Sequence, residues 1–318
     1  MPRGVTGGWS PGIPSGSWEP EEFTNDRGRG LVIRCRLEGA PPGSFDPPAP
    51  LDERLDLVRG VGPATAERLR REGYRSLADL ARHPRFGREA AKAMAAVGSR
   101  DVRALARMGA RDEEMLPLFR MEDAAVVDIE TAGLARVLPV FLIGVALKEV
   151  DGWEVRQYFA RDFAEEAAIL RQVELDLAGL SVCASYNGKA FDEPFVRDRF
   201  RLHGLAGLRF RLHVDLLHTC RRLLRGRLCD FRLSTVEAHL FGAAREEDVA
   251  GHEVPDLYYR YMQEKEEAII LPVLRHNAID LRSLAWLFEW TARGPGRWEA
   301  GAEEENGPEI SGKAAGNG

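Results

Sequence analysis

The spacing of apolar and polar residues divides this chain into a helical part and an α/β part. Between residues 51 and 118, apolar residues recur in short stretches at helical spacing, which predicts several short helices. From residue 124 the pattern predicts three strands followed by helix, strand, helix and strand. The predicted strands lie at 124–130, 140–148, 153–159, 180–185 and 208–214, and the predicted helices at 163–177 and 191–202. Helical spacing dominates after that.

The two ends of the chain have a different composition. Residues 1–50 are rich in Gly, Pro and Ser, and we expect a flexible arm there. The apolar residues at 31–33 are enough for a short strand, but the sequence identifies no partner for it. Residues 294–318 are rich in Gly, Glu and Ala and are predicted to be a disordered tail. Two folded domains are therefore expected, at 51–118 and 119–293.

Two carboxyl groups stand at the end of the first strand of the α/β part. Asp128 and Glu130 are two residues apart, so they point to the same face of a strand. Two acids held so close raise each other's pKa unless a cation lies between them. Mg²⁺ and Mn²⁺ prefer such oxygen ligands. The alternative is an ordinary strand end with two solvated acids, and the pair alone does not decide between them.

Two more acidic positions follow. Asp192 opens the helix after the strand at 180–185, where the helix dipole by itself favours an acid. His276 and Asp280 are four residues apart and share one face of a helix. Taken alone, such a pair is more often a surface hydrogen bond than a site.

The order of these acids resembles the DEDD 3′–5′ exonucleases of the ribonuclease H-like superfamily. Five motifs in the same order are also similar to bacterial YprB-like proteins, over residues 119–292. They lie at 213–218 (HVDLLH), 221–223 (RRL), 233–237 (LSTVE), 249–255 (VAGHEVP) and 276–280 (HNAID). The resemblance implies a mixed five-stranded sheet flanked by helices, with the acids at one edge.

The resemblance also implies a role for each acidic residue in a two-metal mechanism with Mg²⁺ or Mn²⁺. Asp128 would bridge both ions, Glu130 and Asp280 would complete one site, and Asp192 would hold the second ion through water. His276 would be the general base or would orient the attacking water. Histidine-type members place this residue five positions before the last Asp, whereas here it is four, so the role of His276 is less well defined.

Further residues resemble the substrate pocket of the same family. Thr131, Gly133 and Leu134 resemble the loop that contacts the terminal nucleotide, and Asn187 and Phe191 are expected to border that pocket.

Residues 57–69 (LVRGVGPATAERL) resemble a helix-hairpin-helix motif. Glycine at 60 and 62 permits a tight hairpin with close backbone approach, and the proline that follows suits a first helical turn. In that family the backbone N–H groups of the hairpin, here at Gly60, Val61 and Gly62, face a nucleic-acid phosphate without reading sequence. Arg68 and Arg71 are candidates for further phosphate contacts. The alternative is a helical module for protein contacts.

Composition adds limited information on partners and location. The chain is 44% hydrophobic and 30% charged, and no apolar run approaches the roughly 18 residues of a membrane span. The first residues contain no apolar secretion signal, and the four cysteines form no CxxC pair, so we expect a cytoplasmic protein without a membrane partner. Residues 51–111 contain 14 basic and 8 acidic residues although the whole chain carries a net charge of −6.

The sequence therefore predicts a metal-dependent 3′–5′ exonuclease with a DNA-docking domain, acting on DNA in preference to RNA. Two alternatives stay open. One is a non-catalytic nucleic-acid or protein scaffold with a nuclease-like fold, and the other is an RNA 3′-end trimmer with the same catalytic residues.

Overall fold

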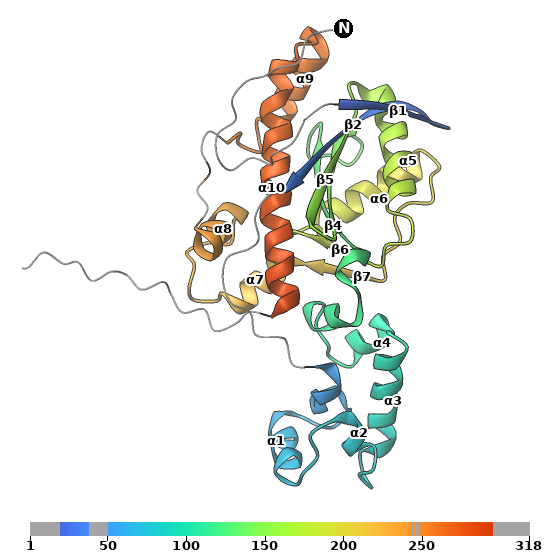
Figure 1. Ribbon diagram of the computed structural model, residues 1–318, viewed down its shortest axis with the longest axis vertical. Helices are drawn as coiled ribbons and strands as arrows, with labels where there is room; N and C mark the ends of the chain where they lie inside the picture. The colour runs from blue at the N-terminus through green and yellow to red at the C-terminus, as the bar shows by residue number, and fades with distance from the viewer. Residues whose placement is uncertain (1–19, 38–49, 243–244, 246–247, 295–318) are drawn as a thin grey trace, which may run out of the picture.

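The computed structural model describes residues 20–37, 50–242, 245 and 248–294, and it places a small helical domain at one end of an α/β domain (Figure 1). Within these described ranges, seven strands form one sheet in the order β1-β2-β5-β4-β3-β6-β7. The strands are β1 (Pro20–Asn25), β2 (Gly28–Leu37), β3 (Ala124–Thr131), β4 (Val140–Glu149), β5 (Gly152–Phe159), β6 (Val182–Ser185) and β7 (Leu212–Asp215).

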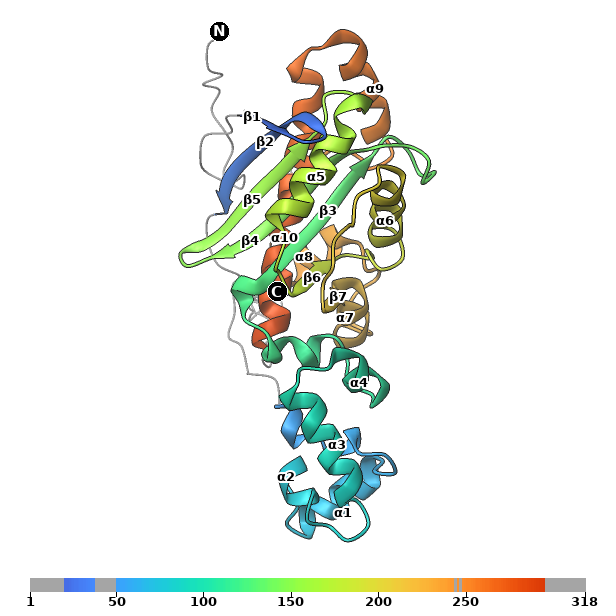
Figure 2. The same ribbon diagram turned by 90° about the vertical axis from the view of Figure 1, so that its right-hand side faces the viewer.

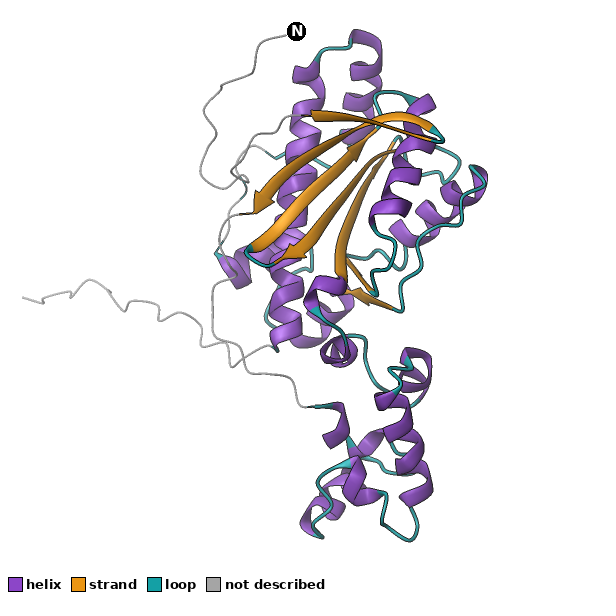
Figure 3. Ribbon diagram, turned by 45° about the vertical axis from the view of Figure 1, so that its right-hand side comes forward, coloured by secondary structure: helices purple, strands orange, loops and turns teal. Residues whose placement is uncertain are grey.

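The strands from β3 to β7 confirm the predicted fold class. β3, β4 and β5 pair antiparallel, whereas β6 and β7 continue the sheet in parallel from β3. Helices cover both faces (Figures 2 and 3). On one face lie α5 (Glu166–Asp176) and α6 (Asp192–Leu202), and on the other lie α7 (Leu216–Leu223), α8 (Leu233–Phe241) and the long α10 (Glu267–Arg293). α9 (Val254–Glu264) packs against α10, with the Tyr258 ring stacked on Phe141 of β4 at 3.8 Å.

The number of strands corrects the prediction of five. Residues 20–37, which were expected to belong to a flexible arm, form β1 and β2, and β2 pairs antiparallel with β5. Ile33 lies opposite Gln157, a separation of more than 120 residues, so no local pattern could identify the partner. The rest of the predicted arm (1–19 and 38–49) and the predicted tail from residue 295 lie outside the described residues.

The helical domain (residues 51–118) is built from short helices, as predicted. They are α1 (Pro63–Arg71), α2 (Leu77–Leu80), α3 (Gly87–Gly98) and α4 (Val102–Arg107), with 3₁₀ turns at Leu51–Glu53, Leu55–Leu57 and Glu113–Leu118, and a further turn at Met121–Asp123 leads into β3. Ser76 caps α2, because its hydroxyl accepts a hydrogen bond from the Asp79 N–H at 3.1 Å. Among the described helices of both domains, none is long and apolar enough to cross a membrane.

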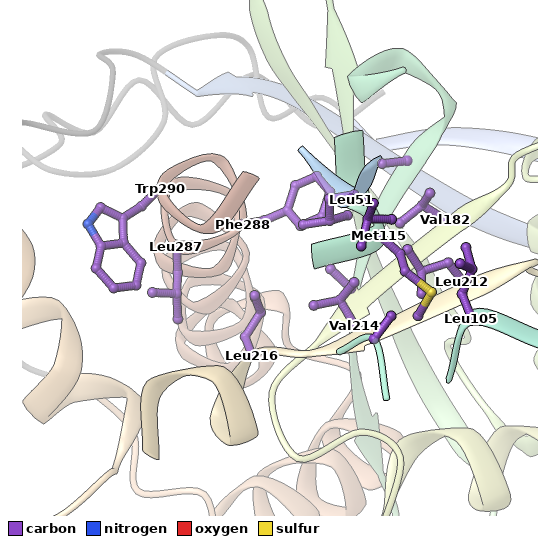
Figure 4. Packing of buried hydrophobic residues seen from close by; sticks show 14 of the residues in the cluster. Leu51, Leu105, Met115, Val182, Leu212, Val214, Leu216, Leu287, Phe288 and Trp290 are labelled. Atoms are coloured by element: carbon purple, nitrogen blue, oxygen red, sulfur yellow. The ribbon is translucent and has the colours of Figure 1, made fainter. Parts of the chain in front are cut away.

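A shared apolar core joins the two domains (Figure 4). Leu105 and Met115 of the helical domain belong to the same buried cluster as Val182 and Leu212 of the sheet and Phe288 of α10. Polar contacts reinforce this junction. The guanidinium of Arg211, just before β7, donates to the carbonyl of Arg100 at 2.9 Å. The helical domain is thereby held against the β6–β7 end of the sheet.

Gly144 of β4 lies opposite Asp128 in the sheet and is in close contact with α10. A Cβ at this position would lie 2.1 Å from Asn277 Oδ1 and 2.7 Å from a methyl group of Leu281. We expect Gly144→Ala to lower the free energy of unfolding by about 3 kcal/mol, because both neighbours are buried and α10 would have to move. Urea unfolding measures this. Gly98→Ala, where a Cβ meets nothing within 4 Å, is the matched control and should not destabilise; equal effects would contradict the explanation.

Candidate active site

Four acidic side chains predicted to form a site come together from three elements. Asp128 and Glu130 lie at the end of β3, Asp192 is the first residue of α6, and Asp280 lies in α10. Burial raises the pKa of Asp128 well above its ordinary value, and the charges of Asp280, Glu130 and Asp192 raise it further. The four carboxyl groups are therefore close enough to repel one another.

The other two acids on the β3–α6 side show the same effect. Burial is the main reason why the pKa of Glu130 is raised, and Asp280 and Asp192 add to it. Burial also raises the pKa of Asp192 to about 7, and the nearby Asp215 contributes to this shift. At neutral pH, without a cation, keeping all these groups ionised costs free energy.

An amide from α10 fixes the Asp128 carboxylate. Asn277 donates from Nδ2 to Asp128 Oδ2 at 2.8 Å, and its own Oδ1 accepts from Gln157 Nε2 of β5 at 2.9 Å. Both amide side chains are fully buried. The sequence analysis did not identify Asn277 as functional, although a buried-face asparagine within an apolar helix was a visible signal.

Asp280 has a protein cation beside it. Arg245 lies between α8 and α9, and its Nη2 is 2.6 Å from Asp280 Oδ1. The same guanidinium pairs with Glu237 at 2.6 Å and Asp248 at 2.7 Å. Burial raises the pKa of Asp280, and the charge of Arg245 opposes the rise. No spacing rule pointed to Arg245.

His276 is held by Asp248, another residue that the sequence analysis did not identify. Its Nδ1 is 2.7 Å from Asp248 Oδ1, and its Nε2 is 3.7 Å from Asp280 Oδ2. Burial alone would lower the pKa of His276, but the hydrogen bond to Asp248 and the charges of Asp280 and Asp128 outweigh it, so the pKa is raised. The pKa of Asp248 is lowered to about 2, because contacts with His276 and Arg245 outweigh its burial.

Asp248→Asn should lower the pKa of His276. The substitution keeps a hydrogen-bond acceptor of similar size but removes the negative charge that stabilises the imidazolium. An NMR titration of the histidine ring protons measures the change, and the exposed His252 serves as an internal reference. An unchanged His276 titration would mean that Asp280 and Asp128 alone set its pKa.

The donor set fits a hard divalent cation in its chemistry. All four acids offer oxygen ligands, they are partly buried, and they repel one another, which a bound cation would relieve. Within the described part of the chain, however, no three His, Cys, Asp or Glu side chains are gathered into a group that could hold an ion. Asp128 and Asp280 are instead contacted by Asn277 and Arg245.

The residues predicted to contact substrate lie at the two loops that flank the acids. Thr131 Oγ1 donates to the Gly133 carbonyl at 2.9 Å, which shapes the start of the β3–β4 loop. Leu134 in this loop is 85% exposed, so its side chain is available to a ligand. Asn187 has a positive φ of 62°, and Phe191 packs on Phe195 at the start of α6.

A buried carboxylate shapes the turn that leads to Asp192. Asp215 at the end of β7 accepts hydrogen bonds from the N–H groups of Asn187 at 2.9 Å and Lys189 at 3.2 Å. It is only 1% exposed. We assign Asp215 a positioning role, since it holds the 187–189 turn from which α6 begins.

The hairpin of the helical domain offers backbone groups rather than side chains. Gly60 has φ +88°, and both Gly60 and Gly62 are exposed. Val61 is buried and its N–H donates to the Val58 carbonyl at 2.9 Å, so that N–H is already used. The N–H groups of Gly60 and Gly62 are the remaining candidates. Arg68 and Arg71 are exposed on α1, and Arg68 lies 3.7 Å from Glu72.

Comparisons with known proteins agree with this architecture. Residues 125–292 match the model of the RNase H superfamily, and residues 52–83 match a SAM-like helix-hairpin-helix tandem. The uncharacterised protein YprB of Bacillus subtilis (strain 168) is 35% identical over 172 residues, which is 51% of this chain and 40% of that protein. A family B DNA polymerase of Pyrobaculum calidifontis superposes with a TM-score of 0.42 at 20% identity, over 52% of this chain and 24% of the polymerase.

Proposed function

Because this chain belongs to the RNase H superfamily, we propose that it is a metal-dependent 3′–5′ exonuclease that prefers single-stranded DNA. The observation that carries the proposal is that Asp128, Glu130, Asp192 and Asp280 lie partly buried near one another. The charges of the other three raise the pKa of Asp128, and Asp280 and Asp192 raise the pKa of Glu130. Acids that served only as a solvated surface would have no reason to be buried together.

In this proposal Asp128, Glu130 and Asp280 would hold one divalent ion, and Asp128 together with Asp192, the latter through water, would hold a second. When bound, such ions supply an activated water and stabilise the departing 3′-oxygen. His276 accepts a proton at Nε2, because Asp248 holds Nδ1 and leaves Nε2 on the side of Asp280. Asn277 orients Asp128 through its hydrogen bond.

The helical domain supplies sequence-independent affinity in this proposal. The N–H groups of Gly60 and Gly62, with Arg68 and Arg71 on α1, would contact the phosphate backbone. The match of residues 52–83 to a helix-hairpin-helix tandem supports this role. We favour DNA over RNA because this motif is commoner in DNA-binding proteins.

A non-catalytic scaffold is the second candidate, and one observation favours it. Arg245 occupies the side of Asp280 with a permanent positive charge, and the described ligands are not gathered for an ion. A scaffold would keep this ion pair, whereas a nuclease must hold Asp280 available for metal. An RNA trimmer would use the same residues and differ only in substrate.

The test is a cleavage assay on 5′-labelled single-stranded DNA and RNA of the same sequence, with Mg²⁺ or Mn²⁺ and with EDTA. A ladder that shortens from the 3′ end and disappears in EDTA supports the exonuclease and shows which sugar is preferred. A ladder only with RNA supports the trimmer. Absence of cleavage with every metal, while binding is retained, supports the scaffold.

A further inference from the structure

A cavity of about 520 Å³ opens on the α6 face of the sheet, directly beside Asp192. Its walls come from β7, α6, the 205–210 segment and α4 of the helical domain. Four arginines line it: Arg103 of α4, Arg197 and Arg201 of α6, and Arg209. We call these four residues and the cavity between them the arginine groove.

The charge of the arginine groove suits a polyanion. The carboxyl groups that line it are those of Asp192 and Glu193, at the end next to the candidate active site. Arg197 lies 3.9 Å from Glu193. Arg103 and Arg209 are exposed, and neither forms an ion pair with any residue that the structure describes. Two guanidinium groups are thus available to phosphates.

The floor of the groove has the composition that a nucleobase requires. The ring of Phe210 is partly exposed and lines it together with aliphatic side chains, which provides an apolar surface on which a base can pack, whereas Phe200 is buried beneath this surface. Polar atoms lie beside this surface. Ser185 Oγ is 2.7 Å from His213 Nε2, and His213 Nδ1 is 3.0 Å from Glu193 Oε2. An apolar floor with a few fixed polar groups is typical of a ligand site.

The groove lies between the two functional parts of the molecule. Both ribbon views place α4 next to β7, and the Arg211 contact to the Arg100 carbonyl holds the start of α4 there (Figures 1 and 2). A single strand whose end lies at Asp192 and whose backbone is held by the helical domain has to pass this region. The arginines come from three elements, so they can contact successive phosphates rather than one.

We propose that the arginine groove binds the single-stranded nucleic acid immediately upstream of the cleaved end. One base packs against Phe210, and Arg103 and Arg209 contact the phosphates on either side of it. This inference rests on the proposed function, because it places the strand relative to Asp192. A free nucleotide shares the same chemistry, and the experiment below distinguishes it from a strand.

The experiment compares binding by full-length variants in EDTA, so that cleavage does not enter. Fluorescence anisotropy of a 5′-fluorescein-labelled 20-mer of thymidylate gives Kd across a range of salt concentrations. We expect the double variant Arg103→Glu/Arg209→Glu to raise Kd at least tenfold and to reduce the salt slope by about 1.4. Arg260→Glu, at an exposed position of α9 that does not line the groove, is the matched control and should change Kd less than twofold. Circular dichroism confirms that each variant is folded.

Two further arms test the base contact and the occupant. Phe210→Ala should raise Kd about fivefold without changing the salt slope, because a base contact carries no charge. Thymidine monophosphate at millimolar concentration should not displace the 20-mer. An unchanged Kd in the double variant, displacement by the mononucleotide, or failure of the wild type to bind the 20-mer would each overturn the groove proposal.

The outcome separates this inference from the nuclease proposal. If the protein binds DNA through the arginine groove but cleaves nothing, the groove proposal stands and the exonuclease proposal is wrong. Conversely, if the wild type and the double variant cleave from the 3′ end with the same KM, the exonuclease proposal stands and the groove proposal is wrong.

Discussion

Asp128→Asn is expected to lower the rate of 3′-end cleavage on the order of 10³-fold and, at the same time, to raise the melting temperature of the metal-free protein. The loss of rate follows because Asp128 is the residue proposed to contact both ions, and an amide is a poor ligand for them. The gain in stability follows because Asp128 is a partly buried carboxylate surrounded by Asp280, Glu130 and Asp192. Asparagine has nearly the same shape and still offers Asn277 an acceptor.

The rate is measured with the labelled single-stranded substrate, and the melting temperature by differential scanning calorimetry in EDTA at pH 8. Asp151→Asn makes the same chemical change at an exposed turn between β4 and β5, and it should alter neither quantity. A variant that keeps more than a tenth of the wild-type rate would remove Asp128 from the catalytic set. A lower melting temperature would show that its charge is compensated in the folded protein.

The metal-free protein is expected to lose stability as the pH rises from about 4 to 8. The pKa of Asp192 is raised from 3.8 to about 7, so the folded state binds a proton in this window that the unfolded state has lost. The contribution of this bound proton to the free energy of unfolding is fully present below pH 4 and is lost as the pH rises through 7. Its upper bound is about 4 kcal/mol. The raised pKa values of Asp128, Glu130 and Asp280 act in the same direction. The lowered pKa of Asp248 acts oppositely only below pH 4, and the lowered pKa of the partly buried His213 acts oppositely below about pH 6.5.

Melting temperatures measured in EDTA between pH 5 and 8 show how steeply stability falls with pH. In Asp192→Asn the melting temperature should fall less steeply with pH, because the carboxyl group whose pKa is raised to about 7 is gone. Mn²⁺ should raise the melting temperature more at pH 8 than at pH 6, because protons compete with the ion for the carboxylates. Matched additions of NaCl exclude a general ionic-strength effect. A slope of opposite sign, or equal Mn²⁺ effects at both pH values, would contradict the electrostatic description of this site.

The comparison of sequence and structure shows which interactions leave a local signal. Strands β3 to β7 were predictable because each carries its own apolar pattern between turns. Strand β2 was not, since its partner β5 lies more than 110 residues further along the chain. Likewise, Asp128 and Glu130 were recognisable from their spacing on one strand, and the fold brings Asp192 and Asp280 near them.

The residues around the acids were harder to predict for a physical reason. Asp248 and Arg245 lie in an irregular segment and form ion pairs with residues of α10. Asp248, for example, precedes its partner His276 by 28 residues, and no periodicity in the sequence marks such a contact. Asn277 is the next residue after His276, yet it contacts Asp128 of β3 whereas His276 contacts Asp248, because neighbours on a helix point about 100° apart. The roles assigned to the predicted metal ligands and substrate contacts stay predictions.

The two N-terminal strands have a consequence for how the molecule is divided. The chain leaves the sheet at Leu37 and rejoins it at Ala124, so the helical domain is an insertion between two strands of one sheet. A polypeptide that begins at residue 51 would therefore lack part of the α/β domain, although it would contain every candidate catalytic residue. It would also leave the β5 edge with unpaired N–H and C=O groups, which favour aggregation. The α/β domain thus has no single cut point that separates it from the helical domain, and the two domains share one buried apolar cluster.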